Sequence, residues 1–125
     1  MAEDSRALLT TLNRLLGARK TSEAESLLCE RLADQPNDAA LHRMLGLVKW
    51  RSHDWRGAEA SWRSSLANNS LDADVHYFLA RLLHRRGRTL PPLGHYFAAV
   101  ILKPDYLRCQ NAIATILARP TPAAT

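Results

Sequence analysis

The sequence predicts an all-α protein, an α-solenoid of three antiparallel helix hairpins closed by a seventh helix. The first observation behind this is a self-similarity at a spacing of 34 residues, since Trp62 lies 34 residues after Leu28 and 34 before Tyr96. His42 and His76 are one period apart as well. A fixed period of this length is typical of stacked helical hairpins. The second observation is that apolar residues recur at three- and four-residue steps, and no alternating strand-like run occurs.

Local signals place the helices in order. The first helix carries an apolar stripe that includes Leu8 and Leu12, and Thr21-Ser22-Glu23 offers an N-cap for the second. The segment 35–38 ends the second helix and begins the third, Asp54 caps the fourth, and the segment 68–70 separates the fourth from the fifth. Thr89 is the expected N-cap of the sixth helix, with Pro91 and Pro92 in its first turn, and Asp105 is expected to begin the seventh. We expect one domain over residues 1–118 and a disordered tail over 119–125.

Composition narrows the class of protein. The 125 residues have a formal net charge of +5, and 46% of them are hydrophobic. These values are ordinary for a globular domain with a small core. No apolar run is long enough to cross a bilayer, so we expect no membrane insertion. Cys29 and Cys109 are isolated, without metal-ligand spacing, which favours reduced thiols in a cytoplasmic protein.

The repeat resembles the tetratricopeptide repeat, whose pattern is W-x₂-L-G-x₂-Y, then A-x₃-F, then P. The second repeat matches best, with Leu45-Gly46 followed by Ala58-x₃-Trp62. The resemblance covers roughly residues 5–118, and the seventh helix resembles the capping helix of such arrays. It implies small residues where helices approach closely, such as Gly46 and Ala58, and large buried residues at Trp62 and Tyr96. Pro92, which stands where the packing alanine belongs, departs from the pattern.

Catalysis is not expected. The sequence has no Ser/His/Asp arrangement with supporting context, no Gly-rich phosphate loop and no paired carboxylates in an apolar setting. His42 and His76 share one repeat position and are interpreted as partly buried structural side chains. His53 falls in a hairpin turn, where histidine tolerates a left-handed backbone. We therefore predict no enzyme activity, no cofactor and no metal site.

The resemblance implies a concave groove lined by the first helix of each pair. Stepping by three and four along those helices predicts a surface that mixes arginines with apolar and aromatic anchors. Such a surface suits an acidic, partly apolar peptide. The first hairpin supplies Leu9, Asn13 and Leu16; the second supplies Arg43, Leu47, Trp50 and Arg51; the third supplies Tyr77, Arg81, His84 and Arg85; and the last helix supplies Arg108 and Asn111.

One subtype of the family grips the C-terminal carboxylate of heat-shock chaperones with a clamp of Lys, Asn, Asn, Lys and Arg. By repeat position, that clamp would fall on Leu9, Asn13, Met44, Asp74 and Phe78. Asn13 alone fits, and Asp74 carries the wrong charge, so this function is not expected.

The leading functional prediction is a non-catalytic protein–protein interaction module, an adaptor or chaperone that holds a peptide segment of a partner in its basic groove. Two alternatives stay open. Nucleic-acid binding is favoured by the basic balance of 14 Arg and 3 Lys and by the run Arg85-Arg86-Gly87-Arg88. A self-associating scaffold that forms a homo-oligomer would use the apolar surface at the ends of an open stack.

Overall fold

The computed structural model is all helical over the residues that it describes, which are 2–87 and 90–118 for the backbone, and 6–87 and 92–118 for the side chains. Within these described residues, seven helices follow one another: α1 (Ala2–Gly17), α2 (Thr21–Asp34), α3 (Ala39–Arg51), α4 (Trp55–Asn68), α5 (Ala73–Arg85), α6 (Leu90–Leu102) and α7 (Leu107–Leu117). The described residues include no strand. The predicted tail at 119–125 and the predicted cap at Thr89 lie outside the described residues.

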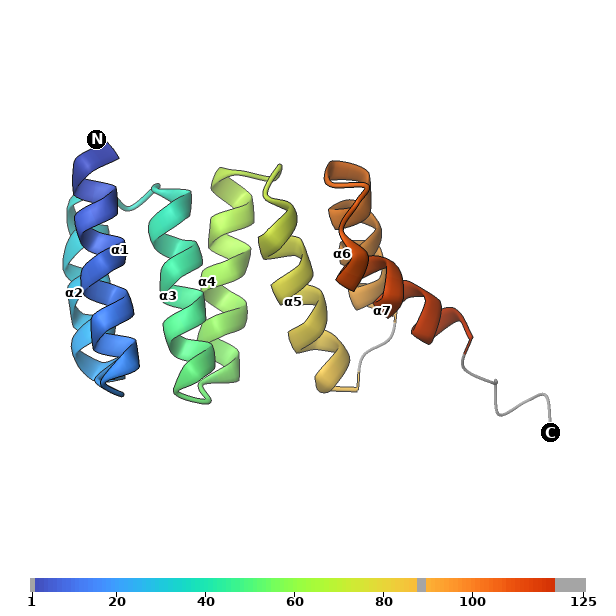
Figure 1. Cartoon of the computed structure of the whole chain (residues 1–125), viewed down its shortest axis with the longest axis horizontal. Coiled ribbons are helices and arrows are strands. Elements are labelled where there is room, and N and C mark those ends of the chain that lie inside the picture. The colour runs from blue at the N-terminus through green and yellow to red at the C-terminus, as the bar shows by residue number, and fades with distance from the viewer. Residues whose placement is uncertain (1, 88–89, 119–125) are drawn as a thin grey trace. The chain divides into compact units, whose positions relative to one another are not determined.

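The helices pair as the 34-residue period predicts. The described residues form two compact units, one that ends at residue 68 and one that begins at residue 69. In the first unit, α1 packs with α2 and α3 with α4, and α2 also packs against α3 (Figure 1). In the second unit, α5 and α6 form a hairpin, and α7 packs against α6.

The cores follow the repeat register. One position is occupied by Leu28, Trp62 and Tyr96, and all three side chains are at most 2% exposed. The predicted burial of Trp62 and Tyr96 is confirmed. The position that faces it across each hairpin holds a side chain of changing size. It is Leu12 opposite Leu28, Gly46 opposite Trp62, and Ala80 opposite Tyr96.

Gly46 shows why the size must change. A Cβ atom added at Gly46 would overlap the indole ring of Trp62, and the indole Nε1 donates to the carbonyl oxygen of Arg43 at 3.3 Å. The predicted close approach at Gly46 is therefore confirmed. Pro92 is also buried in the position of Ala24 and Ala58. It lies in the first turn of α6, where its missing N–H costs little.

Several helix ends agree with the sequence and two differ. The Asp54 carboxylate accepts from the Gly57 N–H at 3.0 Å, as an N-cap does. His53 has a φ of 65°, the predicted left-handed turn. Lys20 is the N-cap residue of α2, without a side-chain cap bond, and Thr21 is already helical, so the predicted cap at 21–23 is one residue late. α7 begins at Leu107, two residues after Asp105, because Tyr106 occupies the N-cap.

Candidate functional site

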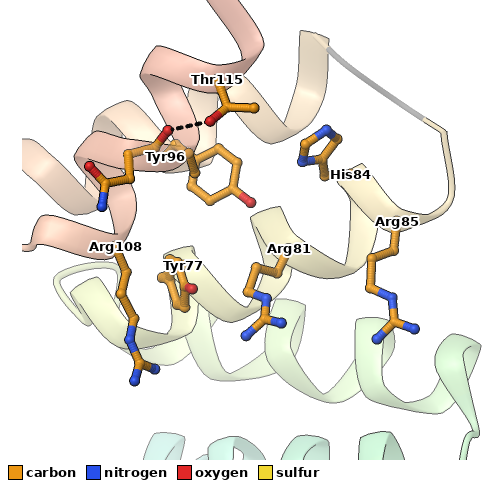
Figure 2. A pocket seen from close by; sticks show the side chains of 9 residues that line it. Tyr77, Arg81, His84, Arg85, Tyr96, Arg108 and Thr115 are labelled. Carbon is orange, nitrogen blue, oxygen red and sulfur yellow. Dashed lines mark hydrogen bonds between the residues drawn. The ribbon is translucent and has the colours of Figure 1, made fainter.

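A pocket of about 590 Å³ opens on the second unit. Residues from α5 line one side of it and residues from α7 the other, while the ring of Tyr96 from α6 lies between them (Figure 2). Its nine lining residues are Tyr77, Arg81, His84, Arg85, Tyr96, Arg108, Asn111, Ala112 and Thr115. Its size is in the range of pockets that hold a ligand or a few residues of a peptide.

The α5 side of the pocket is a single helix face. Tyr77, Arg81 and Arg85 are each four residues apart, and residues at this spacing lie one above the other on a helix. The Arg81 guanidinium carbon lies 5.9 Å from the centre of the Tyr77 ring, a cation–π distance. The Asp72 carboxylate caps the start of α5 by accepting from the Val75 N–H at 3.3 Å. This face is therefore presented by a regular, capped helix.

The α7 side meets α5 at the Tyr77 end of the pocket. The ring centres of Tyr77 and Tyr106 are 5.1 Å apart, just before α7 begins. The Tyr106 hydroxyl hydrogen-bonds to Asp74, and burial followed by this bond raises the pKa of the Tyr106 phenol. Tyr77 also belongs to one apolar cluster with the buried Cys109. The pocket is thus narrow at its Tyr77 end. Further along α7, the Thr115 hydroxyl donates to the Asn111 carbonyl at 2.8 Å.

The pocket is electropositive. Three of its lining residues are arginines and none is acidic. Among the described residues, no ion pair to Arg81 or Arg108 is found within 4.0 Å. Burial, and to a smaller extent Tyr77, raises the pKa of Tyr96 to about 12, so its phenol stays neutral. The chemistry offered is that of guanidinium groups beside aromatic rings, which suits carboxylate or phosphate with an apolar neighbour.

Six of the thirteen residues that the sequence predicts for the groove come together here. They are Tyr77, Arg81, His84, Arg85, Arg108 and Asn111. Sequence reasoning missed Tyr96, Ala112 and Thr115. Tyr96 was assigned to the core, and it is both 1% exposed and part of the lining. Ala112 and Thr115 follow Arg108 by four and seven residues, so the same helical stepping could have found them.

The other seven predicted residues belong to the first unit, on α1 and α3. Leu9, Asn13 and Arg51 are exposed, and Leu16, Arg43, Leu47 and Trp50 are half-buried. The ring of Trp50 lies 6.4 Å from that of Trp55, centre to centre, at the α3–α4 turn. Trp55, the first residue of α4, is itself half-buried. A continuous groove that joins these residues to the pocket stays a prediction.

The shared position of His42 and His76 is structural. His42 Nε2 lies 2.8 Å from the Pro36 carbonyl oxygen, and His76 Nε2 lies 2.9 Å from that of Ser70. A carbonyl oxygen only accepts, so both Nε2 atoms carry the proton. One period later, the Gln110 side-chain amide donates to the Pro104 carbonyl. Each of these helices is thereby tied to the loop before it.

His95 on α6 lies against His76. The two Nδ1 atoms are 3.1 Å apart and the ring centres 5.4 Å apart. With both rings neutral, the proton on His76 Nε2 leaves its Nδ1 as the acceptor, so His95 Nδ1 donates. The described residues hold no group of three or more His, Cys, Asp or Glu that could bind a metal ion. Nor does any described helix have the length and apolar character needed to cross a membrane.

Comparison with known proteins identifies the fold. No family model and no curated sequence matches the chain. Among solved structures, MamA superposes with a TM-score of 0.80 at 18% identity, over 89% of this chain and 65% of that one. A second MamA structure is matched over 61% of its length, so this chain spans less than two thirds of either.

Two of the similar structures contain a bound peptide. The first TPR of Spaghetti (RPAP3), bound to the HSP90 peptide SRMEEVD, has a TM-score of 0.82 at 14% identity, over 94% of this chain and 93% of that one. The Yersinia enterocolitica type III secretion chaperone SycD, in complex with a peptide of the translocator YopD, gives 0.77 at 14% identity, over 94% and 92%. The chain therefore has the fold of a tetratricopeptide repeat array.

Proposed function

We propose that this protein is a non-catalytic interaction module that binds an acidic, partly apolar peptide segment of a partner protein. The observation that carries the proposal is the pocket between α5 and α7. It gathers three arginines beside two tyrosine rings, and none of the nine described residues that line it is acidic. Arginine forms paired hydrogen bonds with carboxylates, and aromatic rings offer apolar contact to the neighbouring side chains.

Proteins of the same fold support this reading. RPAP3 and SycD are both seen with a peptide of another protein, and SycD is a chaperone. We therefore propose an adaptor or chaperone role, with the partner's segment held as a peptide. The residues that carry the heat-shock carboxylate clamp are lacking at four of five positions in this sequence, so the partner proposed is not a chaperone tail of that kind. We propose the cytoplasm as its place of action, in keeping with two free cysteines.

The exposure of aromatic and apolar side chains bears on the two alternatives, nucleic-acid binding and self-association. Nucleic-acid binding would stack bases on open aromatic faces, but Tyr77 and Tyr96 are only 6% and 1% exposed, so the small part of each ring that reaches the pocket can touch an apolar side chain and cannot serve as a platform for a base. This favours a peptide over a nucleic acid at the pocket. Self-association would use exposed apolar side chains such as Ile101, which is 77% exposed. No feature of the described residues around Ile101 identifies a second copy of the chain as its partner.

A peptide-display selection tests the proposal. Random twelve-residue peptides would be selected on the full chain, and labelled copies of the enriched sequences measured by fluorescence anisotropy. We expect enriched peptides to be acidic and to lose at least tenfold in affinity on Arg81→Glu, because one substitution removes a cation and adds a like charge facing the peptide. Circular dichroism should show the same helicity, since Arg81 is exposed and exposed charges contribute little to folding.

The matched control is Arg56→Glu. Arg56 is an exposed arginine in the first turn of α4, where a negative charge is tolerated well. This control has the same change of net charge and should keep affinity within about twofold of the original. Equal losses from both variants would indicate diffuse attraction and refute a peptide pocket. A single-stranded DNA oligonucleotide that binds more tightly than every peptide, with a steep salt dependence, would support the nucleic-acid alternative instead.

A further inference from the structure

The arginines of the pocket form a ladder rather than a cluster. Arg81 and Arg85 are one helical turn apart on α5. Arg108 lies at the Tyr77 end, because Tyr106, two residues before it, packs its ring on Tyr77. Figure 2 shows Arg108, Arg81 and Arg85 in this order, with their guanidinium groups pointing the same way. Three cations are therefore spread along the length of α5 between Tyr77 and Arg85.

The ladder has the spacing of an extended chain. From the level of Tyr77 to Arg85 is eight residues of α5, about 12 Å at the rise of an α-helix. In an extended peptide, every second side chain points to the same face, and two such steps cover about 13 Å. Acidic side chains at three alternate positions would thus meet the three arginines one by one. Three consecutive acidic residues would point their middle side chain away.

The shape of the pocket argues for an extended chain over a helix. An α-helix with its side chains is about 10–12 Å across. At the Tyr77 end of the pocket, the ring of Tyr106, just before α7, packs on the ring of Tyr77 with the ring centres 5.1 Å apart, so α5 and the start of α7 are in contact there and leave no room for a helix between them. An extended strand needs far less width. It can lie along α5 with its acidic side chains toward the arginines.

We propose, on the basis of the function proposed above, that the pocket selects an extended partner segment with acidic residues at alternate positions, [Asp/Glu]-x-[Asp/Glu]-x-[Asp/Glu]. Arg108, Arg81 and Arg85 each donate hydrogen bonds to one of the three carboxylates. The intervening residues face away from α5. Specificity then comes from the spacing of the charges, and not from net charge alone.

Three labelled peptides of identical composition and a net side-chain charge of −3 test the spacing. All carry three Glu in a Ser/Thr/Val background, which disfavours helix formation. In one, the Glu residues alternate; in the second, they are consecutive; in the third, they are four residues apart, as on one face of a helix. We expect the alternating peptide to bind the full chain at least tenfold more tightly than the other two by anisotropy.

A matched pair of variants tests the one-to-one register. Arg85→Gln should weaken the alternating peptide several-fold, yet leave unchanged the affinity of the version in which the Glu at that end is replaced by Gln, because the two groups meet each other. Arg56→Gln on α4 is the control and should alter neither. Affinities within twofold for all three peptides, or tightest binding of the helical spacing, would overturn this inference. Peptide binding that is still lost with Arg81→Glu would leave the proposed function standing in that case.

Discussion

Gly46 packs against Trp62, and this contact predicts that the effect of Gly46→Ala on the free energy of unfolding changes sign when Trp62 is replaced by a smaller residue. A methyl group at Gly46 would overlap the Trp62 indole, which is 2% exposed and cannot move aside. Overpacking of this kind costs about 1–3 kcal/mol. Alanine also gains about 1 kcal/mol over glycine within a helix. With overpacking at the upper end of its range, Gly46→Ala should destabilise the first unit by about 1–2 kcal/mol.

The first hairpin shows how the conflict is relieved. There the equivalent pair is Leu12 and Leu28, both buried, so a leucine leaves room for a larger side chain opposite it. Trp62→Leu alone should cost about 2–3 kcal/mol, less than the 3–5 kcal/mol expected for Trp62→Ala. In the Trp62→Leu background the overlap is gone. Gly46→Ala should then stabilise by up to about 1 kcal/mol, which gives a coupling of about 2–3 kcal/mol between the two positions.

Urea unfolding followed by circular dichroism would measure the four free energies of the cycle. Equal m-values across the variants would show that the same surface is exposed each time. A stabilising Gly46→Ala in the original background would refute the reasoning, because it would mean that the indole does not occupy that space. Additive effects would also refute it, since the two residues would then not be in contact.

Two further predictions concern titratable groups in the second unit. Burial, followed by the charge of Asp74, raises the pKa of Cys109 to about 11. Near neutral pH its thiol should therefore stay protonated and unreactive toward a disulfide reagent, while the exposed Cys29 reacts. Two fast-reacting thiols per native chain would contradict this prediction. Burial also raises the pKa of Tyr96 from 10.0 to about 12, so the stability that its neutral form contributes is complete below pH 10 and is lost as the pH rises toward 12. Tyr96→Phe should flatten that alkaline loss in a series of urea titrations, and an unchanged pH profile would show that Tyr96 is not its source.

Much of the fold could be predicted because a 34-residue period constrains every helix at once. Leu28, Trp62 and Tyr96 share a register position, so one pattern places three core side chains in three hairpins. Helix ends were less predictable, because capping depends on local geometry. Thr21 offers a hydroxyl, yet Lys20 has the non-helical backbone of the cap position.

The site was predictable in part for the same reason. Helical stepping along α5 finds Tyr77, Arg81, His84 and Arg85, because a regular helix fixes which side chains share a face. It could not find Tyr96, since a residue that fills the core can also border a pocket. Whether Tyr96 borders a pocket depends on which parts of α5 and α6 are not covered by α7.

The bonds from His42, His76 and Gln110 to the loops before them have a consequence for how such a chain can evolve. Each of these bonds requires one side-chain N–H group that reaches the carbonyl oxygen six residues upstream. An imidazole and a carboxamide can both supply that N–H group. The amino acid at that position can therefore change between histidine and glutamine while the hydrogen bond is kept. The block of 34 residues from one such hydrogen bond to the next is a natural unit for duplication within this chain.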